Sequence, residues 1–305
     1  MAKVSVLTPS YGYARYLPTA LRSVRTNVGQ YEHVVMDGGS SDGSVELLRA
    51  SDTVWRSEPD KGQSDALNKA LALSSGDVVG WLNADDFYLP GTLDLVAAEM
   101  DAHPDVDVLF GDTVLVDGDG RVQRLLTAYT RGMPTVLRWR GPVYLSTSTF
   151  FRRHVLGDAP FDPEMKMIMD WDIFLRIHAR PEVRVRHVPV PLAGFRFHEA
   201  QVTHGRTEHT GPEHSRLRQI HGIDERRVPL TRTLGVGLHR AAKLAGGGAV
   251  RERASRLLAG VPLLDAEGAV VPGTAQALRR IDDPFHWRSR EDLFTAAAVK
   301  EAGGA

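Results

Sequence analysis

Short apolar runs alternate with segments of helical periodicity over the first ~115 residues. Runs rich in valine predict strands at residues 4–9, 33–39, 53–59, 77–83 and 106–117. Apolar residues at helical spacing between them predict helices at 17–24, 44–49, 64–73 and 93–100. Because strands and helices alternate in this way, we expect an α/β fold with a Rossmann-like, mainly parallel sheet flanked by helices.

The pattern changes after Asp117. The stretch DGDGR (117–121) predicts a hairpin turn, and the clearest later elements are a helix at 170–178 and a strand at 183–197. Residues 230–245 predict a basic amphipathic helix, which the glycines at 246–248 end. We therefore predict a domain over residues 1–204, with halves 1–117 and 118–204, and a helical C-terminal extension over 205–305.

Composition narrows the class of protein. The chain has 305 residues, with 37 Lys and Arg against 38 Asp and Glu, so it lacks the overall positive charge of a nucleic-acid-binding protein. It has no cysteine, which excludes disulfides and thiolate metal sites and fits a reducing compartment. The N-terminus reads as a strand and not as a signal peptide, and no stretch has 18 uninterrupted apolar residues. We predict a soluble, cytoplasmic protein, with contact at a membrane surface left open.

Polar clusters follow each of the first four predicted strands. They are Thr8, Pro9, Ser10 and Tyr11, then residues 37–44, then 58–60, then 83–86. Ligands of open parallel sheets bind at the carboxyl ends of the strands. Four such clusters at one edge therefore predict a binding site there.

The cluster DGGSSDGS (37–44) combines an acid with glycines. Gly38 and Gly39 allow close approach of the backbone to a ligand, and Asp37 can accept hydrogen bonds from an imide N–H or a ribose hydroxyl. The dinucleotide-binding pattern G-x-G-x-x-G is not met. The alternative is a tight strand-to-helix turn with Asp42 as the N-cap.

The stretch VGWLNADDFY (79–88) ends an apolar run at two adjacent acids, Asp85 and Asp86. Their mutual repulsion would be relieved by a cation, and carboxylates suit Mg²⁺ or Mn²⁺. The alternative is that both acids cap the following segment. Asn83 just upstream and the neighbouring polar turns favour a metal site.

Three ordered blocks resemble the family 2 glycosyltransferases, which are inverting enzymes of the GT-A fold. The blocks are TPSYGYARYLPTALRSV, VVMDGGSSDGS and SEPDKGQSDALNKALALSSGDVVGWLNADDFYLPGTL, and the resemblance spans about residues 3–200. It implies that residues 1–117 bind the nucleotide and that 118–204 hold the acceptor and the catalyst. It further implies that Asp37 contacts the base, that Asp85 contacts the ribose, and that Asp86 binds the metal. The remaining donor-binding residues that we expect are Thr8, Pro9, Ser10, Tyr11, Gly39, Asp65 and Asn83; for Asp65 a helix-stabilising acid in the first turn is an equal alternative.

The second half supplies the expected catalyst. MKMIMDWDIFLRI (165–177) resembles the family's E-D-x-D helix start, which implies that Asp170 is the general base, although Met169 stands where glutamate is usual. Asp172 is the backup candidate. FRFHEAQVT (195–203) resembles the family's R-x-H-x-x-x-x-T stretch, which implies that His198 completes the metal shell or contacts the diphosphate and that Arg196 clamps the diphosphate. For His198 a structural role is an equal alternative. Trp139 and Trp171 are candidates for stacking on a sugar or, more commonly, for the core.

The resemblance predicts a metal-dependent, inverting glycosyltransferase of the hexosyltransferase type. With Mn²⁺ or Mg²⁺ as cofactor, it would move a sugar from a nucleoside-diphosphate sugar, UDP-sugar favoured, to a glycan, lipid-linked or small-molecule acceptor. A nucleotide-sugar-binding protein without transferase activity is the first alternative, since Met169 departs from the family pattern. A sugar nucleotidyltransferase is disfavoured because the loop TPSYGYARY has one glycine and no lysine. We expect no nucleic-acid partner, and we leave open peripheral membrane contact through the extension.

Overall fold

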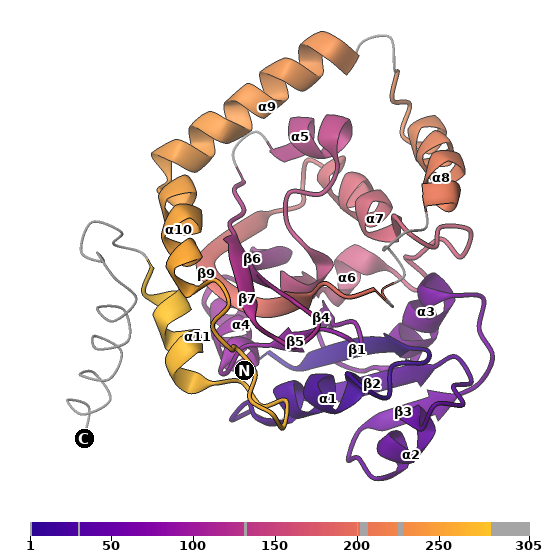
Figure 1. Cartoon of the computed structure of the whole chain (residues 1–305). Coiled ribbons are helices and arrows are strands. Elements are labelled where there is room, and N and C mark those ends of the chain that lie inside the picture. The colour runs from indigo at the N-terminus through magenta and orange to yellow at the C-terminus, as the bar shows by residue number, and fades with distance from the viewer. Residues whose placement is uncertain are drawn as a thin grey trace.

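A curled nine-stranded sheet forms the centre of the molecule, with helices around it (Figure 1). The computed structural model describes residues 2–29, 31–130, 133–199, 201, 207–224 and 228–281. The sheet has the order β3-β2-β1-β4-β8-β6-β9-β5, and β7 pairs with β6 beside this path.

The first four strands of this order are parallel. They are β1 (Val4–Ser10), β2 (Glu32–Asp37), β3 (Val54–Ser57) and β4 (Val78–Trp81). The connecting helices are α1 (Leu17–Arg25), α2 (Ser44–Arg49) and α3 (Gln63–Leu73). All seven elements were predicted from the sequence pattern. The four strands therefore end at one edge of the sheet, as the polar clusters required.

The second part of the sheet is mixed. It contains β5 (Phe87–Tyr88), β6 (Val108–Val116), β7 (Val122–Leu126), β8 (Thr149–Arg152) and β9 (Val185–Arg196). β8 lies between β4 and β6 and is antiparallel to both, whereas β9 runs parallel to β6. β7 is antiparallel to β6, which confirms the hairpin turn at 117–121. The short strands β5 and β8 were not predicted.

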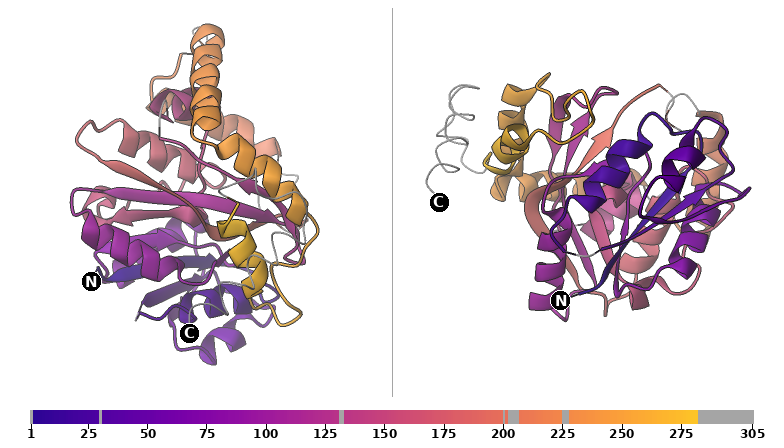
Figure 2. Two further views of the ribbon diagram at one scale, coloured as in Figure 1. Left: turned by 90° about the vertical axis from the view of Figure 1, so that its left-hand side faces the viewer. Right: turned by 90° about the horizontal axis from the view of Figure 1, so that it is seen from below.

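Most of the remaining helices belong to the second half and to the extension. They are α4 (Thr92–Ala102), α5 (Met133–Arg140), η1 (Ser146–Ser148), α6 (Arg153–Leu156), α7 (Met169–His178), α8 (Thr207–Ile220), α9 (Val228–Ala245), α10 (Gly248–Ser255), η3 (Arg256–Leu258) and α11 (Pro272–Arg279). The predicted basic helix lies within α9, and the turn that follows it has Gly247 at φ 74°. In the first view of Figure 2, α9 projects from the rest of the molecule.

The sheet is buried on both faces. One core contains Leu67 of α3 and Ile173 of α7, and the other contains Val24 of α1 and Val96 of α4. A third cluster joins the end of the extension to the sheet, because Leu258, Leu263 and Leu278 pack with Val114 of β6 and Leu125 of β7. The boundary at residue 204 stays a prediction. Among the described residues, no helix is long and apolar enough to span a bilayer.

Candidate active site

The turns after the first three strands are hydrogen bonded to one another. The Gly38 N–H donates to the Ser10 carbonyl at 2.8 Å, and the Glu58 N–H donates to the Asp37 carbonyl at 2.9 Å. These bonds extend the parallel ladder beyond the strands and join the three predicted clusters into one surface.

Asp37 organises the turn after β2. Its Oδ2 accepts hydrogen bonds from the N–H groups of Gly39 (3.1 Å) and Ser40 (2.8 Å) and from the Ser57 hydroxyl (2.6 Å). Its Oδ1 accepts one from the Ser40 hydroxyl. Gly39 has φ 86°, a conformation that side-chain-bearing residues rarely adopt. The carboxylate is thus used largely to shape the turn, and a base contact by Asp37 stays a prediction.

The residues after β1 differ in their orientation. Thr8 is fully buried, and its Oγ1 lies 2.9 Å from Nε2 of His33, so its side chain faces the interior and not the predicted pocket. Pro9 is also buried. Ser10 is 4% exposed, and its hydroxyl has no hydrogen-bond partner among the described residues. Tyr11 is 69% exposed. Of the four predicted residues, Ser10 thus has an unpaired but buried hydroxyl, and Tyr11 is exposed to a ligand.

Asp60 also belongs to this surface. A Cβ added to Gly38 would lie 2.8 Å from Asp60 Oδ2 and 3.2 Å from the ring of Tyr11, so a larger residue there would displace the Asp60 carboxylate. Partial burial raises the pKa of Asp60, and the charge of Asp65 adds to this effect. The sequence analysis placed Asp60 in a polar cluster at a strand end, but it did not name Asp60 as a site residue.

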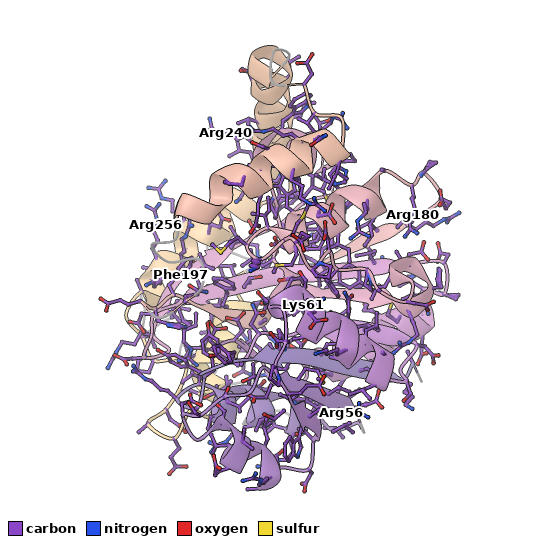
Figure 3. The ribbon with its side chains drawn as sticks, turned by 90° about the vertical axis from the view of Figure 1, so that its right-hand side faces the viewer. Arg56, Lys61, Arg180, Phe197, Arg240 and Arg256 are labelled. Carbon is purple, nitrogen blue, oxygen red and sulfur yellow. The ribbon has the colours of Figure 1, made fainter. Side chains whose placement is uncertain are left out.

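The contacts of Asp65 agree with its alternative role as a helix-stabilising acid. Its Oδ2 accepts a hydrogen bond from the Lys61 N–H and lies 3.2 Å from Lys69 Nζ one helical turn away. Partial burial acts to raise the pKa of Asp65, but these partners outweigh it and the pKa is lowered. The loop that carries Lys61 lies near the middle of the face in Figure 3. Asp65 therefore stabilises the start of α3, and a donor contact by it stays a prediction.

Asp86 is an interior group. It has no exposed surface; its Oδ1 accepts from the Arg196 N–H (2.9 Å), and its Oδ2 accepts from the Thr147 hydroxyl (2.7 Å) and the Asn83 amide (3.2 Å). Burial, and then the neighbouring Asp85, raise the pKa of Asp86 well above its usual range. Asn83 is equally occupied, because its Oδ1 accepts from Gln63 and Trp81. This geometry does not favour Asp86 as the metal ligand or Asn83 as a donor contact.

Asp85 faces a different partner. Its Oδ2 lies 3.0 Å from His198 Nε2, and both side chains are 5% exposed. The His198 ring packs against Tyr16 with centroids 4.4 Å apart. A carboxylate oxygen and an imidazole nitrogen at this separation can bind one divalent cation together. Among the described residues no group of three or more acids and histidines could hold a metal, so further ligands would have to come from substrate and water.

Arg196 supports the acidic turn instead of facing outward. It is 4% exposed, and its guanidinium donates to the carbonyls of Asp85 (2.8 Å) and Gly118 (3.0 Å). Its guanidinium carbon also lies 4.8 Å from the ring centroid of Tyr16. The guanidinium therefore holds Asp85 in place, its Nη2 has no hydrogen-bond partner among the described residues, and a diphosphate contact by Arg196 stays a prediction.

Asp170, the predicted base, is the second residue of α7 and is partly exposed. Its Oδ1 accepts from the Trp171 N–H at 2.8 Å, and the backbone N–H of Asp170 itself also acts on the carboxylate, whereas no side chain among the described residues donates to it. Burial raises the pKa of Asp170 from 3.8 to about 6. An acid with this pKa is ionised near neutral pH and still basic enough to take a proton.

The other candidates near α7 are structural. Asp172 is held by Arg176 and by His221, whose Nε2 lies 2.8 Å from Asp172 Oδ1, which favours a structural role over that of the backup base. Trp171 donates from Nε1 to the Leu137 carbonyl at 2.6 Å. Trp171 and Trp139 both pack against the main core, as the commoner alternative for these residues predicted.

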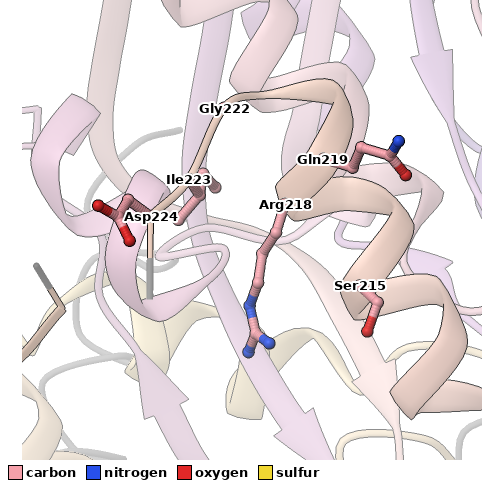
Figure 4. Close-up of a pocket in the computed structure, with 6 residues that line it drawn as sticks. All are labelled: Ser215, Arg218, Gln219, Gly222, Ile223 and Asp224. Carbon is pink, nitrogen blue, oxygen red and sulfur yellow. The ribbon is translucent and has the colours of Figure 1, made fainter. Parts of the chain in front are cut away.

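Two pockets of about 490 Å³ are lined by none of the predicted site residues. One is at the end of α8 and is lined by Ser215, Arg218, Gln219, Gly222, Ile223 and Asp224 (Figure 4). The other lies near β9 and includes His103, Arg184 and His187. The candidate active site is thus the surface of strand-end turns, together with the start of α7.

Comparisons with known proteins agree with this architecture. Residues 5–159, just over half of the chain, match glycosyl transferase family 2. A PGL/p-HBAD biosynthesis glycosyltransferase of Mycobacterium tuberculosis is 26% identical over 210 residues, which cover 63% of this chain and 75% of that protein. An uncharacterized glycosyltransferase of the same organism is 34% identical over 153 residues, covering 48% of this chain and 52% of that protein.

Solved structures share the fold at low sequence identity. Residues 1–349 of S. aureus TarS, in complex with UDP-GlcNAc, are 19% identical with a TM-score of 0.61, covering 99% of this chain and 92% of that chain. The mannosyltransferase PcManGT of Pyrobaculum calidifontis, in complex with GDP-Man and Mn²⁺, is 19% identical with a TM-score of 0.51, covering 99% and 87%. The chain therefore belongs to glycosyl transferase family 2 and is a glycosyltransferase of the GT-A fold.

Proposed function

We propose that this glycosyltransferase moves a sugar from a nucleoside-diphosphate sugar to an acceptor hydroxyl with inversion, and that Asp170 is the general base. The observation that carries the proposal is the state of Asp170. It combines a pKa of about 6 with a carboxylate to which, among the described residues, only backbone N–H groups donate, those of Trp171 and of Asp170 itself. The acids of the strand-end turns, in contrast, have partners in the protein.

The donor-binding surface would be the joined turns after β1, β2 and β3. The exposed Tyr11 ring and the partly buried Asp60 are available there for a base and a ribose, and the buried Ser10 hydroxyl is still unpaired. TarS was crystallised with UDP-GlcNAc, and a glucosyl-3-phosphoglycerate synthase of Mycobacterium tuberculosis, 18% identical with a TM-score of 0.52, was crystallised with UDP. These complexes support a nucleotide-sugar donor and favour UDP.

A divalent cation, Mn²⁺ or Mg²⁺, would be held by Asp85 and His198, and we replace Asp86 by Asp85 in this role. The donor set fits, because the Asp85 Oδ2 and the His198 Nε2 lie 3.0 Å apart and are atoms of the kinds that divalent cations bind. PcManGT was crystallised with Mn²⁺. When bound, the ion would neutralise the charge that develops on the leaving diphosphate.

The mechanism is a single displacement. The acceptor hydroxyl donates a hydrogen bond to Asp170, which takes the proton as the oxygen attacks the anomeric carbon. The new C–O bond forms as the bond to the diphosphate breaks, so the nucleoside diphosphate leaves and an α-linked donor gives a β-linked product. Arg196 and Asp86 keep the Asp85 turn in position through their bonds to it and to each other.

The test of this proposal is the substitution Asp170→Asn. Loss of a general base lowers kcat by about 10²- to 10⁴-fold. Nucleotide binding should be unchanged in calorimetry, because Asp170 is not part of the strand-end turns. Glu164→Gln, at a neighbouring exposed acid, is the matched control and should keep its activity. Near-normal transfer by Asp170→Asn would exclude Asp170 as the base.

The acceptor class stays open between a glycan, a lipid-linked molecule and a small molecule. One observation favours work at a membrane surface: α9 exposes Leu234, Leu238 and Leu244 by 59%, 59% and 65%. Arg240 lies on the same helix (Figure 3). We propose peripheral contact through α9, for which sedimentation with anionic vesicles is the measurement. A Leu234→Ser, Leu238→Ser variant that sediments like the wild type would contradict it.

A further inference from the structure

The four residues before the catalytic helix are held from two sides. On one side, the hydroxyl of Ser64 in α3 donates to the Met165 carbonyl at 2.7 Å. On the other, Glu213 of α8 accepts hydrogen bonds from three consecutive N–H groups, those of Lys166 (3.1 Å), Met167 (2.9 Å) and Ile168 (3.2 Å). This segment therefore has a fixed path between the nucleotide-binding half and α8.

Glu213 is itself firmly placed. It is 8% exposed and lies on α8, which runs beside α7 (Figure 1). Leu217, one turn further on, is fully buried in the same core as Ile173 of α7. Just past the end of α8, His221 contacts Asp172 of α7 at 2.8 Å. The second half of α8 is thus packed against α7, and Glu213 lies at the start of this packed part of the helix.

The bonds to Glu213 matter because the catalytic helix starts directly after this segment. α7 begins at Met169, with Ile168 as its N-cap, and Asp170 is only two residues beyond the last N–H that Glu213 accepts. Hydrogen bonds from N–H groups to a carboxylate are among the stronger hydrogen bonds in proteins. Three of them on consecutive residues restrict the direction in which α7 starts. A shift of about 1 Å in a reacting group can cost a factor of about 100 in rate.

The carboxylate of Glu213 lies near Met169, the position at which this chain departs from the family pattern. The family pattern that this region resembles has glutamate at that position, whereas the Met169 side chain is 3% exposed and belongs to the main core. The chain thus has no carboxylate directly before Asp170. A carboxylate from α8 contacts the preceding backbone instead.

We propose that Glu213 is a positioning residue for Asp170: by holding residues 166–168 it sets the direction of the base toward the acceptor hydroxyl. This inference rests on the proposed role of Asp170 as the base. It assigns to the start of the C-terminal extension a part in the chemistry, in addition to any part in acceptor binding.

The experiment compares Glu213→Ala and Glu213→Gln with the control Arg216→Ala in the full chain. Arg216 lies on the same helix, and its contact is an exposed ion pair with Asp162 instead of the backbone of the segment. We expect Glu213→Ala to lower kcat by about 10- to 100-fold with the donor KM within about twofold, and Glu213→Gln to be intermediate. Arg216→Ala should retain the wild-type kcat.

Two readouts separate positioning from a role in stability alone. Amide hydrogen exchange at residues 166–168 should become at least about tenfold faster in Glu213→Ala and stay unchanged in Arg216→Ala. The acidic limb of the kcat profile should move below pH 6, because a loosened segment lets water reach Asp170. If Glu213→Ala does not fold, Glu213→Gln, which keeps the side-chain shape, is used for the same measurements.

The inference is overturned if both variants keep wild-type kcat and amide protection, or if only the melting temperature falls. A wild-type chain that transfers no sugar from any nucleoside-diphosphate sugar would instead refute the proposed function. In that case amide exchange alone decides whether Glu213 holds the segment.

Discussion

The acids in the two halves of the proposed active site differ in the hydrogen bonds that they accept. In the half that we propose to bind the nucleotide, Asp37 and Asp86 accept four and three hydrogen bonds from their surroundings. In the half that we propose to be catalytic, Asp170 is contacted by the backbone N–H groups of Trp171 and of Asp170 itself, and burial raises its pKa to about 6. An acid held by several donors, side chains among them, shapes a turn, whereas an acid contacted only by neighbouring backbone N–H groups keeps lone pairs that can take a proton from substrate.

Asp85 is the exception in the first half. It is adjacent to Asp86, but its Oδ2 lies against His198, a residue that can itself bind a metal. Two neighbouring carboxylates thus have different surroundings, one filled by donors from the protein and one shared with an imidazole. The comparison therefore distinguishes Asp85, as a group for a cation, from Asp86, as part of the framework.

The largest expected effect tests this distinction. Asp85→Ala and His198→Ala should each weaken Mn²⁺-dependent nucleotide binding by about 100-fold or more, since removing even residues that support metal ligands costs 10- to 100-fold. Calorimetric titration of UDP with and without Mn²⁺ measures this. Glu46→Gln, at an exposed acid on α2, is the control. A full Mn²⁺ effect in Asp85→Ala would return the metal-binding role to Asp86.

The framework role of Asp86 predicts a loss of stability. Asp86→Ala removes the acceptor for the Arg196 N–H, the Thr147 hydroxyl and the Asn83 amide in the interior. Each unsatisfied buried donor costs about 1–3 kcal/mol, and the relief of a buried acid offsets part of the sum, so we expect a loss of about 2–4 kcal/mol in the free energy of unfolding. Urea denaturation measures it. A similar loss in Asp85→Ala would remove the contrast between the two acids.

The same comparison explains how much the sequence could predict. Apart from β5, the elements of the first ~115 residues were predicted because their apolar spacing is a local signal. β5 has two residues, and its partners are Gly194 and Ala193 of β9, more than 100 positions away. β8 is four residues long and pairs with β4 and β6. Such strands exist through distant partners, which a periodic pattern does not contain.

For the site, the sequence indicated places but not side-chain directions. The strand ends do meet at one surface, as the polar clusters predicted. Thr8, however, faces His33, and Arg196 bonds to the carbonyl of Asp85, 111 positions away. Glu213 had no signal, because its three partners lie 45 to 47 positions earlier in a segment without a periodic pattern. Contacts of this kind depend on tertiary packing.

The smallest expected effect concerns Asp170 and stability. Its pKa is raised from 3.8 to about 6 in the folded chain, so between these values the folded state keeps a proton that the unfolded state has lost. The stability of the wild type should therefore fall as the pH rises through this window, by about 1–3 kcal/mol after allowance for partial exposure.

Asp170→Asn cannot titrate, yet its amide oxygen can still accept the Trp171 N–H. Relative to the wild type, its free energy of unfolding should rise from pH 4 to pH 6 and then stay constant, as measured by urea denaturation at several pH values. A difference that does not change with pH would show that Asp170 is as well satisfied as the acids of the strand-end turns, and the contrast between the two halves would then be lost.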